Sequence, residues 1–137
     1  MIKTPLLLLL FSSISYATSF SDGSKRFGLT GGNDACWFDF NNDGWTDVCV
    51  GGNVYRNIEG KKFVFVTKTG PSVAADFDND GFLDLYSWQN RKAYRNIDGK
   101  EFKIIELPEL PKGGSLGACW GDFNGDGFVD IYAGGYE

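Results

Sequence analysis

The chain has 137 residues, enough for one domain of ordinary size, and its 13 basic and 18 acidic residues give a formal net charge of -5. The absence of histidine excludes Ser–His and Cys–His nucleophile pairs and histidine-ligated zinc or haem. The acidic balance argues against nucleic acid as a partner, because affinity for phosphates comes from clustered lysine and arginine. An aromatic content of 16% favours β structure over intrinsic disorder.

Residues 1–17 have the pattern of a secretory signal peptide. Lys3 is followed by an apolar run over residues 6–11 and then by small and polar residues that end at Ala17. The alternative is a membrane span, but the run is too short to cross about 30 Å of hydrocarbon. We therefore expect cleavage after Ala17 and no transmembrane span. The mature chain, residues 18–137, is expected to be secreted and extracellular, or periplasmic or at the cell surface in a bacterium.

The three cysteines have two interpretations in an oxidising compartment. Cys36 and Cys49 flank the same loop and are expected on neighbouring strands, where a disulfide between them would leave Cys119 over. The alternative is that all three are small buried residues with free thiols, which is common for cysteine. Spacing alone does not fix disulfide geometry, so both interpretations stay open.

Two motifs recur along the rest of the chain. A nine-residue motif, D-F-[DN]-x-D-G-[WF]-x-D in all three copies, occupies residues 39–47, 76–84 and 122–130. A second motif, Y-R-N-I-[ED]-G-K, begins at Tyr55 and again at Tyr94, and a phenylalanine follows each copy at the same distance. Its glycine permits the positive φ of a hairpin turn. The alternation of the two motifs indicates a repeating supersecondary unit.

Short apolar segments flank both motifs and predict β-strands, because each is too short for a helix and rich in β-branched and aromatic residues. One unit is then a strand, an acidic loop, two strands, a turn and a fourth strand. Residues 20–29 are expected to form the last strand of a preceding unit. The other expected strands are 35–38, 48–50, 54–57, 63–67, 73–75, 85–88, 93–96, 102–106, 116–120 and 131–133.

Four antiparallel strands in about 40 residues are typical of a β-propeller blade. The predicted fold class is therefore all-β, with two complete four-stranded blades and part of a third, an incomplete propeller of about 2.5 blades. Closed propellers typically have 4–8 blades, and a short stack leaves bare strand edges. We expect the chain to be a fragment of a longer protein; the alternative is association with further blades or with copies of itself.

The nine-residue loops place oxygen donors at positions 1, 3, 5 and 9. Ca²⁺ takes six to eight hard oxygen ligands at about 2.3–2.6 Å. Glycine at position 6 permits the tight turn, and the backbone carbonyl at position 7 completes the set. The expected ligands are Asp39, Asn41, Asp43, Asp47 and the carbonyl of Trp45; Asp76, Asp78, Asp80, Asp84 and the carbonyl of Phe82; and Asp122, Asn124, Asp126, Asp130 and the carbonyl of Phe128.

Up to three Ca²⁺ ions are therefore expected, most tightly in the second loop, which has four carboxylates. An oxygen-only set argues against zinc and copper, and Mg²⁺ prefers a stricter octahedron. The loops are not EF-hands, because Val50, Ser87 and Ala133 stand where the closing glutamate belongs. Ten of the 18 acidic residues lie in these loops, a density that is self-repelling without a cation. The alternative is a set of solvated Asx turns without metal.

Aromatic and arginine side chains recur with the repeat. The tryptophans Trp37, Trp45, Trp88 and Trp120 have two interpretations, carbohydrate stacking or core packing, and the shared repeat position of Trp37 and Trp120 favours packing. Arg56 and Arg95 recur in Tyr-Arg-Asn, which favours a structural hydrogen bond over contact with a substrate. Aromatic residues of the loops are expected to pack between blades; they are Phe40, Phe77 and Phe123 at position 2 and Trp45, Phe82 and Phe128 at position 7.

Together, the three loops and two hairpins over residues 20–137 resemble the FG-GAP/VCBS repeat family. The match is to the repeats of cartilage acidic protein-like and UnbV-like secreted proteins, with integrin α-type propeller blades as more distant relatives. The resemblance implies a Ca²⁺-stabilised propeller used for adhesion or ligand display outside the cell.

The predicted function is accordingly a secreted calcium-binding module for adhesion, with an extracellular protein or glycan as partner. The alternative is the propeller part, catalytic or not, of a polysaccharide-degrading, lyase-like enzyme. A lyase needs a base near a carbon-bound proton. Lys92 and Tyr86 are available, but nothing in the sequence singles them out, so no catalytic residue and no enzyme activity are predicted.

Overall fold

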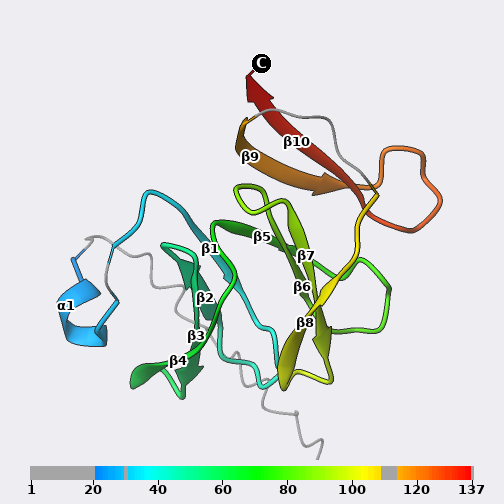
Figure 1. The fold of residues 1–137 in the computed structure, drawn as a ribbon. Helices are drawn as coiled ribbons and strands as arrows, with labels where there is room; N and C mark the ends of the chain where they lie inside the picture. Colours follow the sequence, from blue (N-terminus) through cyan, green and yellow to red (C-terminus); the bar gives the residue numbers. More distant parts are fainter. Residues whose placement is uncertain (1–20, 30, 109–113, 137) are drawn as a thin grey trace, which may run out of the picture.

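The structure, a computed structural model, describes residues 21–29, 31–108 and 114–136 (Figure 1). The predicted signal peptide, residues 1–17, lies outside these residues and stays a prediction. The described elements are a short helix, α1 (Ser24–Phe27), and the strands β1 (Ala35–Phe38), β2 (Asp47–Val50), β3 (Asn53–Ile58), β4 (Lys62–Lys68), β5 (Ser72–Ala75), β6 (Asp84–Ser87), β7 (Lys92–Ile97), β8 (Glu101–Ile105), β9 (Gly114–Gly121) and β10 (Asp130–Tyr136).

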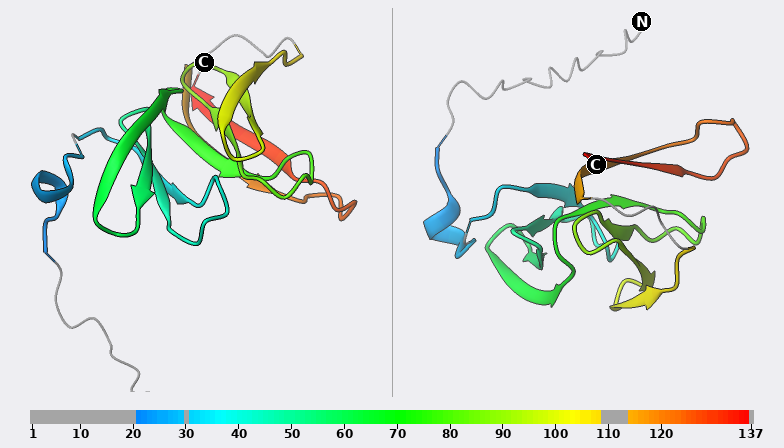
Figure 2. Two further views of the ribbon diagram at one scale, coloured as in Figure 1. Left: turned by 90° about the horizontal axis from the view of Figure 1, so that it is seen from below. Right: turned by 45° about the horizontal axis from the view of Figure 1, so that its top comes forward.

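The strands form three antiparallel sheets in chain order. Strands β1-β2-β3-β4 make the first sheet, β5-β6-β7-β8 the second, and β9 and β10 a two-stranded third. The all-β prediction and the four-strand unit are confirmed, and the observed strand bounds differ from the expected ones by a few residues at most. The three sheets fan out side by side without closing into a ring in the described part of the chain (Figures 1 and 2).

The first strands of the sheets lie next to one another, because β5 contacts both β1 and β9. Behind them, side chains from the first two sheets form one apolar core. The third sheet is attached through Trp120, whose indole N–H donates to the carbonyl of Val73 at 3.3 Å. The buried core residues are Phe38, Phe40, Cys49, Val54, Leu85 and Tyr94.

The strand expected over residues 20–29 is wrong, because Ser24–Phe27 form the helix α1. The carboxylate of Asp22 accepts hydrogen bonds from the Ser24 amide (2.9 Å) and hydroxyl (2.6 Å), which closes a local turn. Gly28, at φ 69°, ends the helix in the left-handed region. Local hydrogen bonding thus takes the place of strand pairing in this segment. The Phe27 ring packs edge-on against the ring of Phe63, with 5.9 Å between the ring centroids.

Cys36 and Cys49 lie directly opposite each other on β1 and β2, as the expectation of neighbouring strands required. Both are nevertheless free thiols in the structure, so the disulfide is not borne out. Cys49 is buried and Cys36 is half-buried, whereas Cys119 is exposed. The alternative of three buried thiols therefore fails for Cys119, whose sheet has two strands in the described part of the chain.

Asn96 joins the first two sheets through buried hydrogen bonds. Its side-chain amide donates to the carbonyl of Phe40 in the first acidic loop at 2.7 Å and to the carbonyl of Leu83 at 3.0 Å. The adjacent turn residue Gly99, at φ 67°, passes so close to the backbone of Asn41 that a β-carbon would lie 2.8 Å from its α-carbon. The hairpin of the second sheet therefore packs against the acidic loop of the first sheet.

Asn96→Ala should destabilise the protein more than Asn57→Ala, its counterpart in the first sheet. Loss of the Asn96 amide leaves two backbone carbonyls without their donor, at a cost of about 3 kcal/mol. Asn57 is half-buried and its side-chain amide donates to one carbonyl, that of Thr46 at 2.9 Å, so about 1 kcal/mol is expected. Urea unfolding of both variants measures the difference, and equal losses would contradict the bridging role of Asn96.

Candidate metal centre

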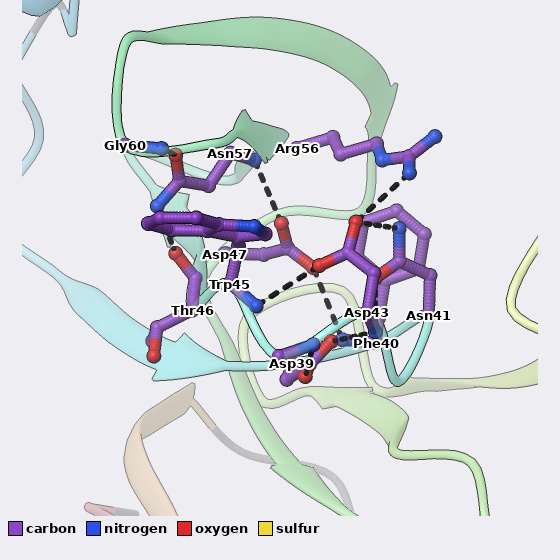
Figure 3. A network of polar contacts seen from close by, with 11 residues as sticks. Asp39, Phe40, Asn41, Asp43, Trp45, Thr46, Asp47, Arg56, Asn57 and Gly60 are labelled. Atoms are coloured by element: carbon purple, nitrogen blue, oxygen red, sulfur yellow. Dashed lines mark hydrogen bonds and ion pairs between the residues drawn. The ribbon is translucent and has the colours of Figure 1, made fainter.

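The three acidic loops share one hydrogen-bonding pattern that gathers the predicted oxygen donors. In the second loop, the Asp76 carboxylate accepts from the amides of Asp80 (3.1 Å) and Gly81 (2.9 Å), and Asp80 accepts from the amide of Phe82 (3.0 Å). The first loop repeats these contacts around Asp39 and Asp43 (Figure 3). The third loop repeats them around Asp122 and Asp126. Positions 1, 3 and 5 therefore come together in each loop.

The carboxylates at position 9 stand at the start of a strand and are buried in two of the three loops. The Asp47 carboxylate accepts hydrogen bonds from the backbone amides of Asn57 at 2.7 Å and Phe40 at 3.1 Å. The Asp84 carboxylate accepts hydrogen bonds from the backbone amides of Asn96 at 2.7 Å and Phe77 at 3.1 Å in the same way. Each carboxylate therefore connects the beginning of its loop to the hairpin strand of the same sheet.

The second loop meets the geometric requirement of a cation site. Asp76, Asp78 and Asp84 each offer an oxygen, and these atoms lie within 4.8 Å of one another. Ligands at about 2.4 Å from a common Ca²⁺ can be at most about 5 Å apart, so the three carboxylates fit one ion. Among the described residues no other such group of acidic side chains forms, because position 3 of the other loops is Asn41 or Asn124.

Arginines of the hairpins bind the loops. Arg56 Nη2 lies 2.8 Å from Asp43 Oδ2, and Arg95 contacts both Asp78 and Asp80, the latter at 3.2 Å. The structural hydrogen bond expected for both arginines is confirmed. The Arg56 guanidinium holds the pKa of Asp43 below its usual value. A cation in the second loop would share two carboxylates with Arg95.

Asparagines at position 4, which the sequence did not single out, connect one loop to the next. The side-chain amide of Asn42 donates to the carbonyl of Gly81 at 2.8 Å, and the side-chain amide of Asn79 donates to the carbonyl of Gly127 at 3.1 Å. Both asparagines have positive φ, a conformation that asparagine tolerates well. The third loop has Gly125 at this position and so lacks the donor.

The position 7 carbonyls of Trp45, Phe82 and Phe128 remain predicted ligands. The side chains of Trp45 and Phe128 are exposed, so packing between sheets is wrong for them, whereas the Phe82 ring lies where the second hairpin meets Asn41 of the first loop. Trp45 lies over Gly60 and Phe82 over Gly99, each in the hairpin of its own repeat. Residue 7 therefore packs along its sheet because the hairpin glycine leaves room for a ring.

At position 2 the expected packing holds for two of the three loops. Phe40 is 3% exposed and its ring lies 5.5 Å from that of Phe102 in the next sheet, and Phe77 lies 6.1 Å from Trp120. Phe123 is 94% exposed, so the expectation is wrong there, because no further sheet covers it among the described residues.

The tryptophans at the shared repeat position also differ. Trp120 packs against Phe77 and Tyr86, as expected. Trp37 is largely exposed beside Phe63, so core packing is wrong for it. Tyr86, one of the bases available to a lyase, is buried and therefore withdrawn from any polymer substrate.

Burial raises the pKa of both inner carboxylates, Asp47 and Asp84, to about 6. Backbone hydrogen bonds lower the pKa of each, and the neighbouring loop carboxylates raise it further. These two sites consequently favour either a proton or a cation beside the carboxylate.

Comparison with known proteins agrees with this repeat geometry. The profile of the FG-GAP-like repeat matches residues 39–87 and 76–133. The chain is 31% identical over 124 residues to cartilage acidic protein 1 of Mus musculus, covering 68% of this chain and 19% of that protein. The Homo sapiens protein of the same name is 30% identical over 124 residues, and the match covers 68% of this chain and 18% of that protein. The chain thus spans about a fifth of these curated relatives. No solved structure matches it.

In chelator, the metal-free protein should lose stability as pH rises from about 4 to about 6. Asp47 and Asp84 have folded pKa values of about 6 against the ordinary 3.8, so the folded state holds more protons in this window. Each carboxyl should cost on the order of 2–3 kcal/mol once both states are ionised. Urea unfolding at pH 4, 5, 6 and 7 measures the slope.

Asp84→Asn provides the matched control, because residue 84 then cannot ionise and the dependence should fall by about half, to the contribution of Asp47. Asp43, whose pKa is lowered, contributes with the opposite sign, in a window below the ordinary value of 3.8. Stability that rises from pH 4 to pH 6 in chelator would contradict the prediction.

Proposed function

Because the chain belongs to the FG-GAP-like repeat family, we propose that it is a secreted calcium-binding module that binds an extracellular protein or glycan. Repeats of this family generally bind Ca²⁺ and its members bind partners outside the cell, as non-catalytic modules. The observation on which the proposal rests is the group of oxygens from Asp76, Asp78 and Asp84 within 4.8 Å of one another. Residues 1–17 support export, and none of the helices in the described ranges is long and apolar enough to cross a bilayer.

The loop residues are arranged to hold a cation and to transmit its effect to the sheets. When bound, Ca²⁺ supplies positive charge that lowers the repulsion among the loop carboxylates. Asp84 places one oxygen at the start of β6, so ordering of the second loop is coupled to that strand. Asn79 then connects this loop to the third through Gly127. The first loop holds Asp39, Asp43 and Asp47, and the third Asp122, Asp126 and Asp130, each with an asparagine at position 3.

Ligand binding is proposed for the exposed surface of the repeats. Trp37 and Trp45 are exposed aromatic side chains on the first repeat and retain the carbohydrate-stacking interpretation. The acidic chain supports a protein or glycan partner over nucleic acid. Adhesion is the use that fits such a stiffened, repetitive surface.

Calcium should raise the melting temperature, and Asp76→Asn should reduce that rise. At 100 times its dissociation constant a ligand stabilises by about 2.7 kcal/mol, which for a domain of this size is a shift of about 10 °C. Calorimetry in Ca²⁺, in Mg²⁺ and in excess chelator measures it. Equal melting temperatures in Ca²⁺ and chelator would contradict calcium binding.

Two further variants sharpen this test. Asp78→Asn gives the second loop the asparagine found in the others and should weaken calcium binding about tenfold while preserving the fold. Asp98→Asn, in a hairpin turn at φ 53° where asparagine is accepted, should leave the calcium shift unchanged. Equal effects of the two substitutions would place the ion elsewhere.

Export should remove residues 1–17 and leave Thr18 as the new N-terminus. Small residues at Ser15 and Ala17 meet the preference of the cleavage enzyme. N-terminal sequencing of the protein recovered outside the expressing cells measures this, with Ala17→Arg as an uncleaved control. An exported protein that retains Met1 would contradict it.

A further inference from the structure

The second sheet departs from the first at the end of its strands that lies away from the acidic loop. Gly51 and Gly52 alone connect β2 to β3, whereas residues 88–91 connect β6 to β7. In the first sheet the chain that leaves β4 closes onto the short turn, because the amides of Thr69 and Gly70 donate to the Gly52 carbonyl at 2.9 and 3.0 Å. No described residue after β8 makes such a backbone hydrogen bond to the longer turn.

A pocket of about 640 Å³ lies between the longer turn and the chain that follows β8. Its volume is in the range of small-molecule sites, about 300–1,000 Å³. We call it the β7–β8 pocket, and its lining combines charged, polar and apolar side chains, among them Asn90, Arg91, Lys92, Ile104, Glu106 and Leu107.

Hydrogen bonds hold the longer turn in place. The side-chain amide of Asn90 donates to the Thr69 carbonyl at 2.7 Å, and the backbone amide of Trp88 donates to the Pro71 carbonyl at 3.2 Å. Arg91 has a positive φ of 55°, a conformation that such a residue keeps only where its surroundings impose it. The turn side of the pocket is therefore preformed, which lowers the entropy cost of binding a ligand.

The charges of the β7–β8 pocket favour an anion. Its described lining contains two cations, Arg91 and Lys92, and one carboxylate, Glu106. Lys92 and Glu106 are exposed, and neither makes an ion pair with a described residue. The acidic loop stands at the other end of β6, because Asp84 begins this strand and the longer turn follows its last residue. The pocket is thus separated from the loop carboxylates that would repel an anion.

The remaining groups suit a hydroxylated ring. The carboxylate of Glu106 and the side-chain oxygen of Asn90 are acceptors for hydroxyl groups. Ile104, which is 56% exposed, and Leu107 offer apolar surface to the carbon-bound hydrogens of a ring. A cation, hydroxyl acceptors and an apolar contact together complement a sugar that carries a carboxylate.

We propose that the β7–β8 pocket binds a uronic acid unit of an acidic polysaccharide. The sugar carboxylate is placed at Lys92 and Arg91, and ring hydroxyls at Glu106 and Asn90. The proposal deepens the glycan-binding part of the proposed function and rests on it. An acidic peptide would satisfy the two cations but would leave both hydroxyl acceptors without a donor of this kind, so a sugar acid is the better match.

A trimer of galacturonic acid is the probe. Titration into the isotopically labelled full chain should shift the amide resonances of residues 90–92 and 104–107 at one trimer per chain. The matched control is the methyl ester of the same trimer, which keeps the rings and hydroxyls and removes the charge. The ester should bind about tenfold more weakly, because it loses its ionic contacts with both cations. Triglutamate, which has the charge without the ring, should also bind more weakly than the trimer.

Three variants locate the site. Lys92→Gln should weaken trimer binding about fivefold and leave the melting temperature unchanged, because the side chain is exposed. Lys100→Gln removes the same charge at the hairpin turn, at the other end of β7 and β8, and should leave the affinity unchanged. Glu106→Ala should weaken binding although it makes the pocket more positive, a result that attraction by charge alone does not produce.

Four results would overturn the proposal: equal affinity for the methyl ester, equal effects of Lys92→Gln and Lys100→Gln, tighter binding to Glu106→Ala, or resonance shifts at Trp37 and Trp45 without shifts at residues 90–92. Binding of triglutamate as tight as that of the trimer would overturn it too and make an acidic peptide the occupant.

Each titration is run in Ca²⁺ and in chelator. A chain that binds the trimer without a calcium shift in melting temperature retracts the calcium proposal alone. A chain that shows the calcium shift without binding the trimer retracts the uronic acid proposal alone.

Discussion

The interaction on which the two complete repeats depend is the buried carboxylate that closes the acidic loop of each, Asp47 in the first and Asp84 in the second. Asp47 and Asp84 each accept two backbone N–H groups, one from the start of the loop and one from the hairpin strand. A buried carboxylate is costly unless its oxygens are paired or neutralised. Loop, strand and hairpin are thereby tied to one charged group, which explains why the acidic motif and the hairpin motif recur together.

Contacts between neighbouring sheets run in both directions along the chain. Asn42 and Asn79 reach from one loop to the next, and Asn96 reaches back from the second hairpin to the first loop. The second unit consequently covers the loop of the first, whereas nothing in the described part of the chain covers the third loop at Phe123. In such quasi-one-dimensional arrays, stability comes from the interfaces between neighbours as much as from each unit, so the terminal units differ from the inner ones.

The loops combine two ways of compensating acidic charge. Arginines of the hairpins neutralise Asp43 and Asp80, while Asp76, Asp78 and Asp84 remain close enough to share a cation. Arg95 also contacts Asp78, so a cation held by Asp76, Asp78 and Asp84 would share that carboxylate with the guanidinium. Charge compensation by both the arginine and a cation matters most in the second loop, because it has a fourth carboxylate, Asp78, where the other loops have asparagine.

The sequence by itself determined most of the strands, the turns and the clustering of oxygen-bearing side chains in the loops, because the nine-residue spacing and the glycine positions act over short distances along the chain. It failed at residues 20–29, where the Asp22 side chain captures the backbone locally and forms a helical turn in place of a strand. Only the tertiary structure decided which equivalent residues are buried, since Phe40 and Phe123 have the same motif and opposite environments. It also decided the partners of Asn96 and Asn79, because those contacts depend on how one sheet packs on the next.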